Sequence, residues 1–166
     1  MFPLKPISRD STEGALAKAE RYRLLNEPTE AESICRDILE IDPGNAAARI
    51  SLILALTDQI SHYEGAFSDA VNAIAALESP YDRAYYLGIA WERRAKAFYE
   101  GRLHGSAGYV YEWLVKALGF FEQAERIRPP ANDDAILRWN ACVRFLACHR
   151  ELGPKREEAP DPILSE

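Results

Sequence analysis

Apolar side chains recur along this chain at the spacing of helix faces, and prolines and glycines separate the runs. The clearest run has apolar residues at i, i+3, i+4, i+7 and i+8 of one face: Ala31, Ile34, Cys35, Ile38 and Leu39. The pattern predicts helices over residues 11–25, 29–41, 46–60, 68–78, 80–100, 109–128 and 133–152. No segment shows a convincing strand pattern, so the sequence predicts an all-α fold.

Capping signals mark several of the predicted helix starts. Asn45 and Ser79 precede the third and fifth helices, and a proline follows Ser79 at the first helical position. Thr29 with Glu32 matches the capping-box spacing at the start of the second helix. For the first helix, Ser11 or its neighbour Asp10 is the expected cap.

Composition limits the classes of protein and of partner. Hydrophobic types make up 48% and charged types 28% of the chain, which is typical of a globular protein. A net charge of −6 argues against nucleic acid as a general partner, because phosphate binding needs a basic face. We expect an extended leader over 1–10, one helical domain over 11–152 and a disordered, charged and Pro-rich tail over 153–166.

Cysteine and histidine placement excludes the common reactive sites. Cys35, Cys142 and Cys148 include no CxxC pair, so we expect buried free thiols in a reducing, cytoplasmic compartment and no structural zinc. The three histidines share no short spacing with acids, and no phosphate-binding loop or nucleophile elbow occurs. The first residues hold no apolar run of the length that a secretory signal requires, and no apolar stretch is long enough to cross a membrane, so we expect neither. The sequence therefore predicts no metal, no cofactor and no catalytic residue.

An internal repeat is the strongest signal in the chain. The 34 residues Thr12–Asn45 resemble one tetratricopeptide repeat (TPR). The family's packing positions are filled here by Ala15, Ala19, Tyr22, Ala31, Cys35, Ile38 and Pro43. Small residues at such positions let neighbouring helices approach closely, and the proline ends the second helix of the unit.

The resemblance continues to about residue 152. A second unit fits with Leu52, Leu56 and Ala70, if about five residues are inserted before Phe67. A third unit, Tyr81–Ala131, matches the family core at Leu87–Trp91. It carries about 17 extra residues before its closing positions Ala117, Phe121, Ala124 and Pro129. The last helix, with Trp139 and Cys142, resembles a capping helix. The resemblance implies a right-handed superhelix of three TPR-like helical hairpins plus a C-terminal capping helix, with the third hairpin elongated.

Protein binding is the function that the resemblance implies. The chain would be an adaptor or scaffold that holds a peptide or helix of a partner in a mostly apolar concave groove, with Tyr85 as an expected hot spot. Segments of the chain itself, such as Ile163-Leu164, could fill the groove instead. The groove positions carried over from the family are Leu16, Glu20, Leu24, Ile50, Leu54, Asp58, Tyr85, Ile89, Arg93, Ile136, Asn140 and Arg144.

One recognition mode of the family is not expected here. Some TPR modules grip the C-terminal carboxylate of a chaperone with lysine, asparagine and arginine side chains. The matching positions supply no cation: Leu16, Glu20, Ser51, Asp82 and Tyr86. A buried carboxylate without donors is costly, so we expect no such clamp.

The elongated hairpin carries a second candidate surface and a run of charges. Its tip is rich in aromatic residues that shorter neighbouring hairpins would leave uncovered, so we expect either a homodimer or a covering segment of the chain. The tip residues are Phe98, Tyr99, Leu103, Tyr109, Tyr111 and Trp113. The charges run from Glu92 to Arg102 and indicate a solvated face with i, i+4 pairs such as Glu92–Lys96, or a basic spot for an acidic partner segment.

Two other functions stay open beside the protein-binding module. The apolar sixth helix is compatible with a structural homo-oligomerisation module, which equilibrium sedimentation would detect. An enzyme without a recognisable motif is disfavoured, because no His, Cys and acidic groups converge in the sequence.

Overall fold

The computed structural model describes residues 2–63, 65–101 and 107–154. Within these ranges the chain forms one short 3-10 turn, seven α-helices and no strand, which confirms the all-α prediction. The helices are α1 (Thr12–Leu24), α2 (Pro28–Ile41), α3 (Ala46–Asp58), α4 (Ala66–Ala75), α5 (Pro80–Glu100), α6 (Ala107–Arg126) and α7 (Asp134–Cys148).

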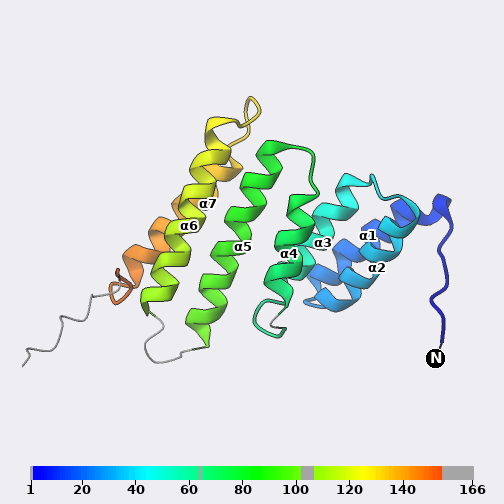
Figure 1. Cartoon of the computed structure of the whole chain (residues 1–166), viewed down its shortest axis with the longest axis horizontal. Coiled ribbons are helices and arrows are strands. Elements are labelled where there is room, and N and C mark those ends of the chain that lie inside the picture. The colour runs from blue at the N-terminus through cyan, green and yellow to red at the C-terminus, as the bar shows by residue number, and fades with distance from the viewer. Residues whose placement is uncertain (1, 64, 102–106, 155–166) are drawn as a thin grey trace, which may run out of the picture.

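The helices lie side by side along the long axis of the molecule (Figure 1). Each helix packs against its neighbour in the chain, and α1, α3, α5 and α7 also contact one another in succession. The odd-numbered helices therefore form one layer, and α2, α4 and α6 form a second. The helices α5 and α6 are the longest, with 21 and 20 residues against 13 and 14 in α1 and α2.

Two of the predicted helix caps are confirmed. The side chain of Asn45 accepts a hydrogen bond from the Ala48 amide at 2.9 Å, and the Ser79 hydroxyl accepts one from the Asp82 amide at 3.1 Å. Both caps satisfy amides that a helix start leaves unpaired. These bonds fix the starts of α3 and α5 where the sequence places them.

The predicted capping box of the second helix is wrong. The helix begins at Pro28, one residue early, and the Thr29 hydroxyl donates to the Gln59 side chain at 3.2 Å. The Gln59 amide in turn donates to Glu32 at 2.7 Å. Gln59, directly after α3, thus hydrogen-bonds both side chains that the capping box would have used, Thr29 and Glu32.

The extended leader ends earlier than predicted, and the first helix lacks its expected side-chain cap. Residues Arg9–Ser11 form a 3-10 turn ahead of α1. The Ser11 hydroxyl donates to the Ser8 carbonyl at 2.7 Å instead of capping α1. In the predicted tail, residues 155–166 lie outside the described residues.

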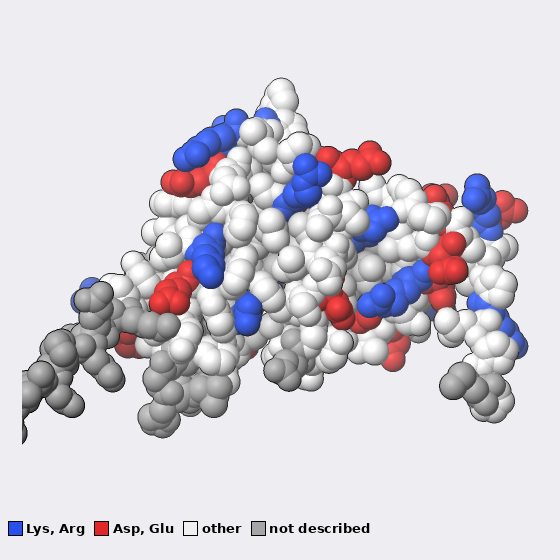
Figure 2. Space-filling view, in the orientation of Figure 1, with Lys and Arg blue, Asp and Glu red and all other residues white. Residues whose placement is uncertain are grey.

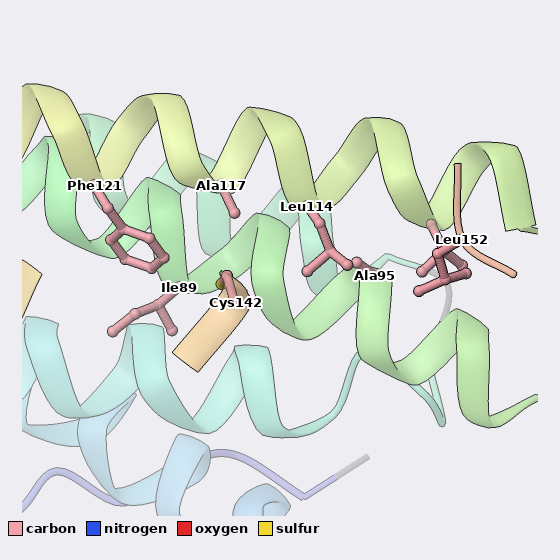
Figure 3. Close-up of a cluster of buried hydrophobic side chains, with 8 residues drawn as sticks. Ile89, Ala95, Leu114, Ala117, Phe121, Cys142 and Leu152 are labelled. Atoms are coloured by element: carbon pink, nitrogen blue, oxygen red, sulfur yellow. The ribbon is translucent and has the colours of Figure 1, made fainter. Parts of the chain in front are cut away.

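The largest cluster of buried side chains joins α5, α6 and α7 (Figure 3). Phe121 is fully buried in this cluster, where its ring lies next to Gly88 of α5. A Cβ atom at position 88 would lie 2.4 Å from Cε1 of Phe121, so the ring requires glycine there. The core members are Ile89, Ala95, Val110, Leu114, Ala117, Phe121, Cys142 and Leu152.

The three cysteines are free, and one of them is not buried as predicted. Cys35 and Cys142 are buried, whereas Cys148 at the end of α7 is exposed. Burial and the negative charge of Glu92 raise the pKa of the Cys142 thiol from 9.0 to about 12. In the described part of the chain, no helix combines the length and the apolar character that crossing a bilayer requires.

The Cys142 thiol should make the fold sensitive to alkali. Above pH 9 the unfolded thiol ionises while the folded thiol keeps its proton, so the folded state binds more protons. The free energy of unfolding should therefore fall as pH rises from about 9 toward 12. Urea unfolding at a series of pH values measures this slope, and Cys142→Ala should make it shallower. An unchanged slope in that variant would assign the effect to other groups.

Candidate functional site

The predicted groove residues lie on the layer formed by α1, α3, α5 and α7. Within each helix they are four residues apart and share one face. Leu24 is 88% exposed, and Glu20 and Arg144 are also exposed. The half-buried members are Leu16, Ile50, Leu54, Asp58, Tyr85, Arg93, Ile136 and Asn140.

Ile89 is a correction to the predicted groove. Its side chain is 1% exposed and belongs to the core cluster of α5, α6 and α7. The partly buried Leu54 packs against the same cluster. A partner on this face cannot reach Ile89, because it fills the interior of the helical array.

An ion network connects three helices of this layer. Arg23 of α1 donates through Nε to Oδ2 of Asp58 in α3 at 2.9 Å. Arg93 of α5 lies 2.6 Å from the other oxygen of Asp58 and donates to the Leu54 carbonyl at 3.1 Å. Asp58 and Arg93 are both predicted groove positions, and the structure brings them together.

The network has one carboxylate between two guanidinium groups. The three side chains are 20%, 25% and 24% exposed, so solvent reaches them only in part. Burial lowers the pKa of Arg93, and the negative charge of Asp58 opposes that shift. A pocket of about 190 Å³ opens beside Asp58 and Arg93, between α3 and α5. The pocket places Arg93 and Lys96 beside Asp58 and Glu100, so it can accept a polar group that bonds to both kinds of charge.

A second ion cluster ties α5 to α7. Glu92 is 1% exposed, and its Oε1 lies 2.6 Å from Nζ of Lys96. Its Oε2 lies 3.7 Å from Arg138 of α7 and makes no hydrogen bond among the described residues. The predicted Glu92–Lys96 pair is confirmed, but Glu92 is not on a solvated face, because α7 packs over it.

Tyr85 is a packing residue as well as a groove position. Its ring stacks on Tyr81 at 5.8 Å and lies 6.1 Å from the ring of Phe121. The side chain contacts two core clusters. Replacing it would therefore disturb folding and binding together, so it is a poor test of the groove.

The tip aromatics of the long hairpin divide between two faces. Tyr99 packs on α7, with its ring 5.5 Å from Phe145, and its hydroxyl donates to Glu151 at 2.8 Å. Phe98 and Tyr109 instead pack on Trp113, at 5.2 and 6.2 Å. Tyr109 is 47% exposed and Tyr111 is half-buried, while Leu103 lies outside the described residues. Tyr99 is thus covered by α7 and the residues that follow it, as one of the two expectations required. A two-fold interface between copies at the remaining tip residues stays a prediction.

Comparison with known proteins gives no relative for this chain. No protein-family model, no curated protein and no solved structure matches it. Among the described residues, no group of three or more His, Cys, Asp or Glu side chains could hold a metal ion. The geometry of the layer formed by α1, α3, α5 and α7 is therefore the basis for assigning a function.

Proposed function

We propose that this chain is a TPR-like protein-interaction module, an adaptor or scaffold that holds a peptide or helix of a partner protein. In this proposal α1, α3, α5 and α7 line the concave side of a right-handed superhelix. The supporting observation is the Arg23–Asp58–Arg93 network, which crosses three helices on one face and remains partly accessible. A cytoplasmic partner fits the free cysteines, and the acidic net charge disfavours nucleic acid.

The same face supplies apolar contacts beside the charges. Leu24 projects from α1 almost fully exposed, and half-buried Leu16 and Ile50 belong to the same predicted row. An amphipathic helix would place its apolar side on these residues and an acidic side chain at Arg23 or Arg93. Leu24 is the best probe of this contact, since it has no core role that its replacement would disturb.

A displayed library of random peptides, selected on the purified chain, tests the proposal. Leu24→Glu should weaken the selected peptides by roughly 1–3 kcal/mol of binding free energy in a fluorescence anisotropy titration, because the anchor is lost and a charge takes its place. Val115→Glu is the matched control, since Val115 is 45% exposed on α6 in the other layer. If only Val115→Glu weakens peptide binding, the peptides bind the layer of α2, α4 and α6, which contradicts this proposal.

A further inference from the structure

Arg94 lies beside the network residue Arg93 in sequence but contacts the other layer of helices. Its guanidinium is 4.2 Å from the ring centroid of Phe67 in α4 and 4.3 Å from that of Trp113 in α6. Trp91 of α5 lies 5.4 Å away. Aromatic rings from two neighbouring helices thus hold a planar cation at one place.

This cation has no anionic partner in the described part of the chain. Burial is the one cause that lowers the pKa of Arg94, and no neighbouring carboxylate opposes the shift. Arg93, one residue earlier, has Asp58 as a counterion. Arg94 therefore combines partial desolvation with an unused capacity to donate hydrogen bonds to an anion.

A pocket of about 580 Å³ opens at this guanidinium. It lies between the residues that follow α3, the start of α4 and the C-terminal half of α5. Its walls include Ile60, Phe67, Phe98 and Trp113, and Arg94 is the charged side chain among the described residues that line it. Figure 2 shows that the surface over α4, α5 and α6 is mostly uncharged, with scattered basic side chains and a few acidic ones. Among the described residues the pocket thus combines aromatic walls and two serines, Ser61 and Ser68, with one cationic group, which fits an anionic group joined to an apolar one.

We propose that this pocket, the Arg94 pocket, binds a segment of a partner protein in which an aspartate or glutamate is adjacent to a bulky apolar side chain. Rings pack on the guanidinium, so its N–H edge is the part free to bond, and a planar carboxylate matches that edge with two hydrogen bonds. Lys116 lies on the ring of Trp91 and is not among the residues that line the pocket. The one cation among the described lining residues balances a carboxylate but not a phosphate dianion. The aromatic walls accept the apolar neighbour.

The Arg94 pocket is separate from the proposed groove. Arg93 contacts α3 residues of the first layer, whereas Arg94 contacts Phe67 and Trp113 of the second layer. The two surfaces could be occupied at the same time. The inference does not depend on the proposed function, and the two fail independently.

The probe is a dye-labelled peptide with blocked ends in which an aspartate precedes a leucine and a phenylalanine. Its control is the same peptide with asparagine in place of aspartate. Fluorescence anisotropy with the full chain should show the aspartate peptide binding about tenfold to a hundredfold more tightly, which is typical of a charge-assisted hydrogen-bonded pair. Equal affinity for the two peptides would overturn the proposal.

Two variants assign the binding to Arg94. Arg94→Gln should remove the preference for aspartate, and Ser68→Glu should do so without altering Arg94, because it places a competing carboxylate in the pocket wall. Glutamate at position 68 lies in the first turn of α4, where acids are tolerated, so this variant should fold even if Arg94→Gln does not. Arg126→Gln is the control, since Arg126 is a 74% exposed arginine of α6. A preference that survives Ser68→Glu would refute the assignment.

Two further outcomes would replace the proposed occupant. Displacement of the peptide by an equal concentration of inorganic phosphate would show a general anion site. Binding that appears only after Asp161→Asn and Leu164→Ser are introduced together would make a segment of the chain itself the occupant. The proposal of a partner segment is supported if phosphate does not displace the peptide, if the unsubstituted chain binds the peptide, and if the preference for aspartate is intact.

Discussion

Phe121→Ala is expected to lower the free energy of unfolding by about 3–5 kcal/mol, because it removes a fully buried ring and leaves a cavity. The ring fills the space between α5 and α6 next to Gly88, and the ring of Tyr85 lies 6.1 Å from it. Urea unfolding followed by circular dichroism measures the loss.

Glycine-to-alanine substitutions provide the matched control for this packing. Gly88→Ala should cost about 1–3 kcal/mol, because the new methyl group would lie 2.4 Å from the ring. Gly119→Ala, at a helical position with open space around it, should instead stabilise the fold by up to about 1 kcal/mol. Equal stability of the two variants would contradict the placement of Phe121 against α5.

Lys96→Met is expected to lower the free energy of unfolding by about 2–4 kcal/mol. The substitution leaves the carboxylate of Glu92, 1% exposed, with Arg138 as its one described ion-pair partner, at 3.7 Å. Solvent screens part of the lost attraction, because Lys96 itself is 33% exposed. Chemical denaturation at neutral pH measures the effect.

The double variant Glu92→Leu, Lys96→Met separates a stranded charge from lost packing. It should recover most of the stability, since an apolar pair of similar size removes the uncompensated carboxylate. Arg126→Met is the control, because the Arg126–Glu122 pair is more than half exposed and should contribute at most about 0.5 kcal/mol. A double variant less stable than Lys96→Met alone would show that Glu92 contributes through other contacts.

Capping signals predicted helix starts correctly where the cap bonds an amide close to it in the chain. Ser79 and Asn45 cap amides three residues away, so their sequence context contains the whole interaction. The capping box at Thr29 failed because Gln59, thirty residues later, bonds Thr29. No local pattern distinguishes a side chain that caps its own helix from one that a distant residue occupies.

The candidate sites depend even more on contacts between helices. The family positions carried over to α5 placed both Arg93 and Ile89 in the groove. In the structure Arg93 joins an ion network between helices, which spacing along α5 did not predict, and Ile89 lies in the core. Arg94 looked like one member of a solvated charge run, because the rings that flank it come from α4 and α6. One sequence signal could have indicated the Arg94 site. Arg94 has no acid three or four residues later, and the surrounding segment is rich in aromatic residues.

The linear order of the helices determines which parts of the chain can unfold locally. Each helix packs on its chain neighbours, so α1 and α2 depend on the rest of the molecule chiefly through α3. Stability in such an array is a sum of local terms, and an end unit can open while the others stay closed. Fraying at the α1–α2 end would disconnect Arg23 from Asp58, yet it would leave α4, α5 and α6 around Arg94 intact.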